Sequence, residues 1–176
     1  MSAAIPSAPE PLKPLSTAAL TVRTTPVTAI MTRRIEMVAA SIAVSYAARI
    51  MVDQTITGMP VTNDDGTIIG MLCAADLLRA VSGLGSTPPS EAAREGYYTD
   101  IRPSVLYAPD FIRGKLQGTV REYMSTVVVT LSTDDTVQGA ASTMMENGVT
   151  HALVLDKNDN LAGILTAEDI MRHVAG

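Results

Sequence analysis

An internal repeat is the feature that most restricts the fold of this chain. Residues 27–81 align with residues 120–174 at a constant offset of 93 residues without a gap, and 14 of the 55 aligned positions are identical. Self-similarity at a fixed offset marks duplicated structural units. The shared residues keep both the apolar periodicity and the turn positions, so we infer two copies of one fold unit.

Each copy shows the same order of predicted elements. A short apolar run with β-branched residues predicts a first strand at Ile35–Val38 and at Val127–Leu131. Matched apolar residues at helical spacing then predict a helix. Two further apolar runs joined by turn-forming residues predict a hairpin, and a second helix follows at 74–81 and 167–174. The predicted order is β-α-β-β-α, with a parallel crossover before the antiparallel hairpin.

The size of the unit indicates how the two copies are arranged. A unit of about 55 residues buries only about 60% of the surface of its extended chain, which makes it marginally stable alone. If both helices cover one face of the small sheet, the other face is left for the second copy. We therefore expect an α/β (α+β) fold in which two pseudo-symmetric β-α-β-β-α units pack sheet to sheet.

The repeat divides the chain into four segments. Residues 21–82 form repeat 1 and residues 120–176 form repeat 2. Residues 1–20 are rich in proline, alanine and serine, which predicts a disordered N-terminal segment. Residues 83–119 hold four of the six aromatic side chains. We expect this stretch to be an ordered insertion that packs on the pair or on a partner.

Composition and charge exclude several classes of protein. A net charge of −5 argues against a nucleic-acid partner, which would need a basic face. The single cysteine, Cys73, cannot form an intramolecular disulfide, and no His or Cys cluster has the spacing of a zinc site. The apolar runs are far shorter than the roughly 20 residues that span a bilayer, and no secretory signal is evident. We expect a cytoplasmic protein without a membrane partner or a metal.

The tandem unit resembles the cystathionine-β-synthase-type (CBS) domain pair, also called a Bateman module. The resemblance rests on a Gly-apolar-apolar-x-x-x-Asp pattern at 70–76 and 163–169, where the third strand of each copy meets its second helix. Further matches are Gly58-Met59-Pro60-Val61 and the segments 29–32 and 122–125, which precede the first strands. The resemblance implies regulation by AMP, ADP, ATP, NAD or S-adenosylmethionine, and assembly into a homodimer.

The resemblance also implies that each ligand site borrows residues from both copies. The better site would combine the second-copy residues Thr166 and Asp169 with adenine contacts from the first copy: Thr32, Glu36, Ile56 and Thr57. Its pseudo-symmetric mate would combine Cys73 and Asp76 with Ser125, Val129, Val149 and Thr150. Cys73 departs from the usual threonine or serine, and a thiol is a weak donor. We therefore expect this second site to be weak or vacant.

Elementary chemistry supports a sugar-phosphate ligand at these turns. An ionised aspartate only accepts hydrogen bonds, and its two oxygens match the two hydroxyls of a ribose cis-diol. The first turn of a helix also favours an anionic phosphate. Arg33 and Arg34 could contact phosphate, although solvated surface arginines are the simpler interpretation.

Plainer structural roles remain open for the other candidate residues. Thr166-Ala-Glu-Asp169 also fits a helix capping box, and the two roles can coexist. His151 could contact a ligand, but the simpler interpretation is that it is a half-buried histidine on a strand. Cys73 fits a small buried side chain better than a nucleophile.

Two hypotheses of function follow. The first is a non-catalytic sensor that binds an adenosine-type ligand between the repeats and signals to a regulated protein through altered packing of repeats or subunits. The second is a structural dimerisation module that docks a partner through the insertion 83–119. An enzyme is not expected, because the sequence has no phosphate-binding loop, dinucleotide fingerprint or nucleophile elbow, and no catalytic residue is assigned.

Overall fold

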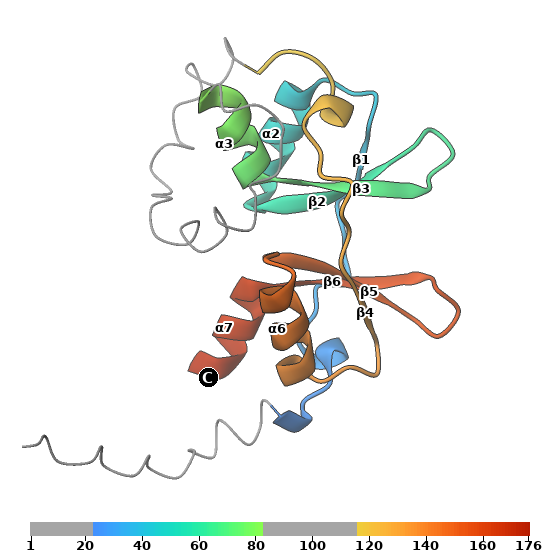
Figure 1. Cartoon of the computed structure of the whole chain (residues 1–176), viewed down its shortest axis with the longest axis vertical. Helices are drawn as coiled ribbons and strands as arrows, with labels where there is room; N and C mark the ends of the chain where they lie inside the picture. Colours follow the sequence, from blue (N-terminus) through green and yellow to red (C-terminus); the bar gives the residue numbers. More distant parts are fainter. Residues whose placement is uncertain (1–22, 83–115) are drawn as a thin grey trace, which may run out of the picture.

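Figure 1 shows a computed structural model that describes residues 23–82 and 116–176. The aromatic positions of the predicted insertion and the predicted disordered N-terminus (1–20) lie outside these residues. Within them, the predicted β-α-β-β-α order is confirmed in both copies. Each copy forms its own three-stranded mixed sheet.

The first unit contains β1 (Val38–Ala39), α2 (Val44–Gln54), β2 (Gly58–Thr62), β3 (Ile68–Cys73) and α3 (Ala74–Ser82). β1 pairs with β2 in parallel, and β2 pairs with β3 in antiparallel orientation. α2 presents its matched apolar residues to the sheet, and all four are buried: Val44, Ala47, Ala48 and Met51. The helical spacing of these residues thus predicted the buried face correctly.

The second unit repeats this topology with β4 (Thr130–Ser132), α6 (Val137–Glu146), β5 (His151–Leu155), β6 (Leu161–Thr166) and α7 (Ala167–Ala175). β4 pairs with β5 in parallel, and β5 pairs with β6 in antiparallel orientation. Short 3₁₀ turns at Val27–Ala29 (η1) and Val120–Glu122 (η3) precede the two units.

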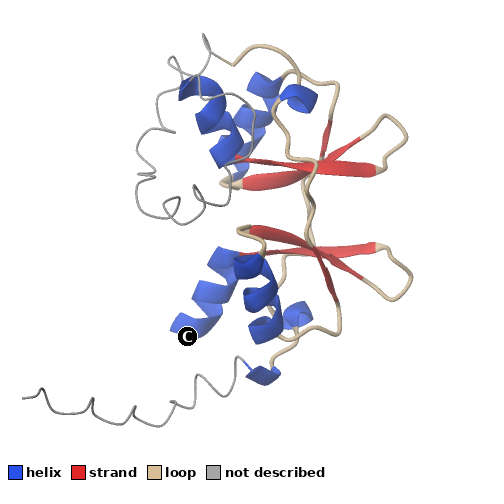
Figure 2. Cartoon of the chain, in the orientation of Figure 1, coloured by secondary structure: helices blue, strands red, loops and turns tan. Residues whose placement is uncertain are grey.

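The two sheets face each other and the helices cover their outer faces (Figure 2). A small apolar cluster fills the space between the sheets and draws on both repeats; its buried members are Met71, Leu153 and Ile164. Each unit also has one larger apolar cluster, which lies between its sheet and its helices. The predicted sheet-to-sheet packing is therefore confirmed, and it gives the pair a common core.

The segments that precede the first strands cross between the units. Val27 and Met31 are buried in the core of the second unit, whereas Leu116 and Val120 are buried in the core of the first. We call residues 27–32 and 120–125 the lead-in segments. The sequence repeat and the packing unit therefore differ at their beginnings, because each copy contributes its lead-in segment to the other.

This exchange explains why the first strands are shorter than predicted. The stretch Ile35–Val38 was expected to be a strand, but pairing with β2 begins only at Val38. Ile35 instead packs against the cluster between the sheets. Val128 does the same in the second copy, and β4 begins at Thr130. These two apolar residues are partly buried between the sheets while the chain passes from one sheet to the other.

Candidate functional site

The turn from β6 into α7 holds the two residues that the sequence analysis placed in the better site. Thr166 is the residue before the helix, and its hydroxyl accepts a hydrogen bond from the Asp169 amide at 3.1 Å. In return, Asp169 Oδ2 accepts from the Thr166 amide at 2.9 Å and from its hydroxyl at 2.7 Å. The capping box is therefore present, and it fixes the carboxylate at the helix N-terminus.

The other carboxylate oxygen of Asp169 is less engaged. Its neighbour is Arg172, whose Nη1 lies 3.7 Å from Oδ1. Arg172 Nη2 instead donates to Glu168 at 2.7 Å. Among the hydrogen bonds of the described residues, none is made to Asp169 Oδ1. This oxygen therefore keeps its capacity to accept a hydrogen bond at a positively polarised helix end.

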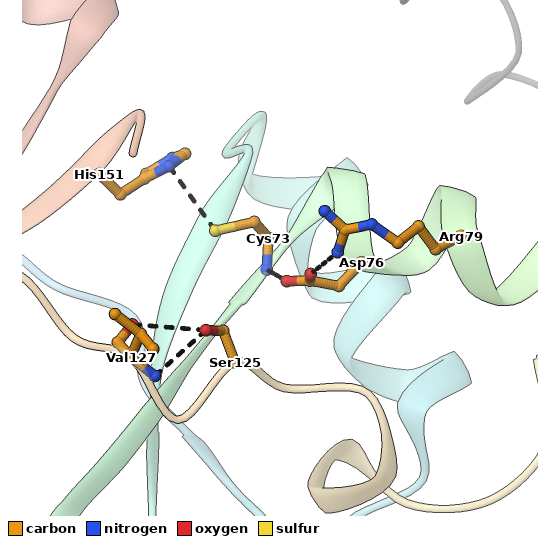
Figure 3. A network of polar contacts seen from close by, with 6 residues as sticks. All are labelled: Cys73, Asp76, Arg79, Ser125, Val127 and His151. Atoms are coloured by element: carbon orange, nitrogen blue, oxygen red, sulfur yellow. Dashed lines mark hydrogen bonds and ion pairs between the residues drawn. The ribbon is translucent and has the colours of Figure 1, made fainter. Parts of the chain in front are cut away.

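At the pseudo-symmetric turn from β3 into α3, the aspartate is held by the protein through both of its oxygens (Figure 3). Asp76 Oδ2 accepts from the Cys73 amide at 2.8 Å, and Oδ1 accepts from Arg79 at 2.8 Å. The two aspartates are equally buried, with side-chain exposures of 10% for Asp76 and 9% for Asp169, whereas the arginines differ: Arg79 is 20% exposed and Arg172 is 70% exposed. Burial raises the pKa of the Asp76 carboxyl, and the Cys73 amide and Arg79 oppose that rise. Both carboxylate oxygens already have partners within the protein.

The thiol of Cys73 is not prepared for nucleophilic chemistry. Burial, followed by the charge of Asp76, raises its pKa to about 12, and Arg79 only partly offsets them. A thiol with such a pKa stays protonated and unreactive near neutral pH. Cys73 is partly buried and packs against the apolar cluster between the sheets, which agrees with a small apolar side chain better than with a nucleophile.

The lead-in segment of the first copy brings residues to the β6–α7 turn of the second copy. The lead-in segment of the second copy brings residues to the β3–α3 turn of the first copy. Thr32 pairs with Ile164, two residues before Thr166, through two backbone hydrogen bonds of 2.9 Å. Ser125 pairs in the same way with Met71, two residues before Cys73. The structure therefore places Thr32 beside the Thr166 turn and Ser125 beside the Cys73 turn.

Close packing enforces these two crossings. A Cβ atom at Gly70 would lie 2.5 Å from the Ser125 carbonyl oxygen, and one at Gly163 would lie 2.5 Å from Met31 Sδ. The glycine of each Gly-apolar-apolar pattern therefore lets the lead-in segment of the other copy approach the strand.

His151 lies on a strand, as the sequence analysis expected, but its contacts with the other repeat were not predicted. Its side chain is buried, with 7% exposure, and it lies between the two repeats. Nε2 is 3.0 Å from the Thr57 hydroxyl, and Nδ1 is 2.9 Å from the Thr150 hydroxyl. Figure 3 shows the same ring approaching Cys73, with 3.8 Å between Nδ1 and Sγ. Its one sequence signal was that histidine replaces Gly58 of the other copy.

The remaining predicted residues fall into two groups. Thr57 and Thr150 are exposed and adjoin His151. Three others contribute their side chains to the apolar cores: Ile56, Val129 and Val149. Glu36 is half-buried and Arg34 is exposed. Arg33 is also exposed and donates to the Thr28 carbonyl at 3.1 Å.

Two absences hold for the described part of the chain. Residues 23–82 and 116–176 contain no helix with the length and apolar character needed to cross a membrane. The same residues contain no group of three or more His, Cys, Asp or Glu side chains that could hold a metal ion.

The fold is also that of solved structures with bound adenosine compounds. The CBS domain pair of protein MJ0100, in complex with 5′-methylthioadenosine and S-adenosyl-L-methionine, superposes with a TM-score of 0.63 at 22% identity, covering 86% of this chain and 97% of that one. CBSX2 in complex with AMP gives a TM-score of 0.59 at 23% identity, covering 86% and 97%. At these identities the likeness establishes the fold.

Sequence comparison gives the family. A homoserine O-acetyltransferase of Methanobrevibacter ruminantium is 41% identical over 102 residues, which are 57% of this chain but only 21% of that protein. The chain therefore spans about a fifth of the length of this relative. The sequence pattern of the CBS domain matches residues 27–83 and residues 120–176. With two such domains in tandem, the chain belongs to the CBS domain family.

Proposed function

We propose that this chain is a non-catalytic sensor module that binds an adenosine-containing ligand between its two CBS domains. The candidate ligands are AMP, ADP, ATP, NAD and S-adenosylmethionine. Binding would alter the packing of the repeats or of two subunits, and a regulated protein would respond to that change. The ligand must bind the two packing states with different affinities, because equal affinities shift no equilibrium.

The state of the Asp169 carboxylate carries this proposal. Its Oδ2 is held by Thr166, while Oδ1 has Arg172 only at 3.7 Å. A carboxylate held in this way can accept from a ribose hydroxyl without first breaking an internal hydrogen bond. The complexes of MJ0100 with 5′-methylthioadenosine and S-adenosyl-L-methionine, and of CBSX2 with AMP, support an adenosine-type ligand.

The same reasoning assigns unequal roles to the two turns. Asp76 already binds Arg79 and the Cys73 amide, so a ribose would have to displace the guanidinium. We therefore expect the Thr166/Asp169 cleft to be the stronger site and the Cys73/Asp76 cleft to be the weaker one.

Titration calorimetry with AMP, ATP, NAD and S-adenosylmethionine tests the proposal. Asp169→Asn keeps an oxygen that can accept from Thr166 but adds donors where the ribose needs an acceptor. We expect it to weaken binding of the preferred ligand by at least about tenfold, as for a charged hydrogen bond of roughly 1.5–3 kcal/mol. Asp76→Asn is the matched control and should leave the stronger site unchanged. Equal affinity in wild type and Asp169→Asn would refute the site.

The structural alternative predicts a different result. A dimerisation module without a ligand should show no rise in melting temperature with any of these compounds, whereas a sensor is stabilised by whatever binds its folded state. The homodimer stays a prediction for either function. Large exposed apolar side chains on the helices favour it: Val52 on α2, Met145 on α6, and Met171 on α7. Sedimentation of wild type and Met145→Glu would test it.

A further inference from the structure

His151 occupies the point where the two repeats meet. It is the first residue of β5, and its counterpart at the offset of 93 is Gly58. A Cβ atom at Gly58 would lie 2.8 Å from His151 Nε2 and 2.9 Å from Cδ2. Thus the glycine of one copy makes room for the ring of the other, and no second side chain of this size could fit there.

Each nitrogen of the ring contacts a hydroxyl from a different candidate cleft. Nε2 is 3.0 Å from Thr57, which the proposed function assigns to the Thr166/Asp169 site. Nδ1 is 2.9 Å from Thr150, which the proposed function assigns to the Cys73/Asp76 site. Both threonines are exposed, so their hydroxyls also reach the surface. The ring therefore connects the Thr57 and Thr150 hydroxyls through two hydrogen bonds.

A neutral imidazole has one N–H and one lone pair, so the two contacts must have opposite polarity. Burial lowers the pKa of His151, with partial opposition from Asp169, and so favours the neutral ring. If the proton is on Nε2, the ring donates to Thr57 and accepts from Thr150. If it is on Nδ1, both directions reverse.

Cys73 decides between these two forms. Its Sγ lies 3.8 Å from His151 Nδ1, and its pKa of about 12 keeps the thiol protonated. A thiol is a weak donor and a weak acceptor. Nδ1 thus faces two groups that carry protons, the thiol and the Thr150 hydroxyl. Nε2 faces only one such group, the Thr57 hydroxyl. The additional thiol therefore favours the lone pair on Nδ1 and the proton on Nε2.

We infer that His151 is a specificity-determining residue that gives the two clefts opposite hydrogen-bonding character. Its Nε2–H donates to Thr57, which leaves the Thr57 hydroxyl proton to donate to a ligand in the Thr166/Asp169 cleft. Its Nδ1 accepts the Thr150 proton, so that Thr150 can only accept from a ligand in the Cys73/Asp76 cleft.

For an adenosine ligand, this arrangement discriminates between acceptor and donor edges of the base. Thr57 suits an unprotonated ring nitrogen, whereas Thr150 suits the exocyclic amino group. The identity of the ligand rests on the proposed function, but the relay from Thr57 through His151 to Thr150 does not.

Nitrogen NMR of the ligand-free protein tests the relay first. The chain has two histidines, so His173→Gln leaves His151 as the only one, and its two ring nitrogens can be observed directly. We expect Nε2 to show the chemical shift of a protonated nitrogen and Nδ1 that of an unprotonated one when the ring is neutral. A proton on Nδ1, or an equal mixture of both forms, would overturn the inference.

Calorimetry with AMP then tests the effect on the cleft. The amide of His151→Gln replaces Nε2 and can still donate to Thr57, whereas the amide of His151→Asn replaces Nδ1 and leaves Thr57 without this partner. We expect His151→Asn to bind AMP about fivefold more weakly than His151→Gln, the effect of one net hydrogen bond. Melting curves of both variants show whether they are folded.

The outcomes separate this inference from the proposed function. Equal affinities of the two folded variants for AMP would overturn the specificity role of His151, while binding by wild type would still support a sensor. No binding of AMP or the other adenosine compounds by wild type, together with the expected NMR result, would overturn the proposed function and support the relay.

Discussion

Arg172 donates to Glu168 at 2.7 Å and thereby stays 3.7 Å from Asp169. In the other repeat, the equivalent Arg79 bonds directly to Asp76 at 2.8 Å. The sequence explains the difference, because the position of Glu168 is occupied by Ala75 in the first copy. We therefore expect Glu168 to keep Arg172 off the candidate ribose-binding carboxylate, a role that Ala75 cannot have in the first repeat.

Replacing Glu168 should close the stronger cleft. In Glu168→Ala, Arg172 loses its partner and is expected to move onto Asp169 as Arg79 does onto Asp76. A ligand must then displace the guanidinium, and we predict that the affinity for the preferred adenosine compound falls about fivefold. Calorimetry measures this change. The free energy of unfolding should fall by only about 0.2–0.5 kcal/mol, as for an exposed helix pair.

The reciprocal variant, Ala75→Glu, provides the control. It offers Arg79 an alternative partner on the first turn of α3 and should release Asp76. We expect binding at the Cys73/Asp76 cleft to strengthen while the Thr166/Asp169 cleft is unaffected. Unchanged affinities in both variants would show that the arginines do not control access to the carboxylates.

Protonation of His151 in mild acid should lower the stability of the folded protein. Burial lowers the pKa of its imidazole from the ordinary value of 6.5, and the Asp169 carboxylate on α7 opposes this. The other facing groups are neutral: the protonated Cys73 thiol on β3 and the hydroxyls of Thr57 and Thr150. Below pH 6.5 the unfolded chain therefore binds a proton that the folded chain binds less readily.

The sign of this effect is defined by linkage. The contribution of His151 is fully present above pH 6.5 and is lost as the pH falls toward its lowered folded pKa. Melting temperatures on both sides of pH 6.5 measure it. Asp76, whose pKa is raised by burial, acts in the opposite direction, so the comparison with His151→Gln is required. A wild-type curve parallel to that of His151→Gln would contradict the prediction.

The sequence predicted the elements of each unit because their signals are local. The helical apolar spacing around Val44 and Met51 and the turn residues of the hairpins do not depend on the rest of the fold. The exchange of lead-in segments is different. A constant-offset alignment shows that Met31 corresponds to Met124, but not that Met31 packs on the second copy and Met124 on the first.

In the candidate site, too, the local features could be predicted from the sequence and the contacts between the repeats could not. Thr166 and Asp169 carry a capping signature within four residues, and the structure shows that capping box. The contact between His151 and Thr57 joins residues 94 positions apart. It depends on how the two sheets face each other, and no local pattern encodes that. The position of Arg172 depends in turn on a side-chain competition between Glu168 and Asp169.

The two crossing glycines should differ in their tolerance of a methyl group. Gly70→Ala places its Cβ 2.5 Å from the backbone oxygen of Ser125, whereas Gly163→Ala meets the side chain of Met31 first. A flexible methionine can adjust and a paired backbone carbonyl cannot. We predict a loss of about 1–3 kcal/mol of unfolding free energy for Gly70→Ala and a smaller loss for Gly163→Ala. Urea denaturation measures both.

The control for these two variants is an alanine at a glycine that has space for a Cβ atom. The nearest neighbour of a Cβ atom at Gly139, in α6, is Thr136 Oγ1 at 3.4 Å. Gly139→Ala should therefore stabilise the protein by about 0.5–1 kcal/mol through helix propensity. Equal losses at Gly70 and Gly163 would show that the lead-in segments adjust equally well on both sides.

The C-terminal ends of the first helix in each repeat give the last prediction. Thr55 ends α2 with φ 55° and ψ 44°, a left-handed conformation that disfavours a β-branched residue. Its counterpart, Gly148, has φ 61° without that penalty. Thr55→Gly should raise the free energy of unfolding by about 0.5–1 kcal/mol, because part of the gain is offset by the greater freedom of glycine in the unfolded chain. Gly148→Thr should lower it by about 1–2 kcal/mol. Urea denaturation of both variants measures these changes, and a Gly148→Thr protein as stable as wild type would show that the strain is relieved elsewhere in the turn.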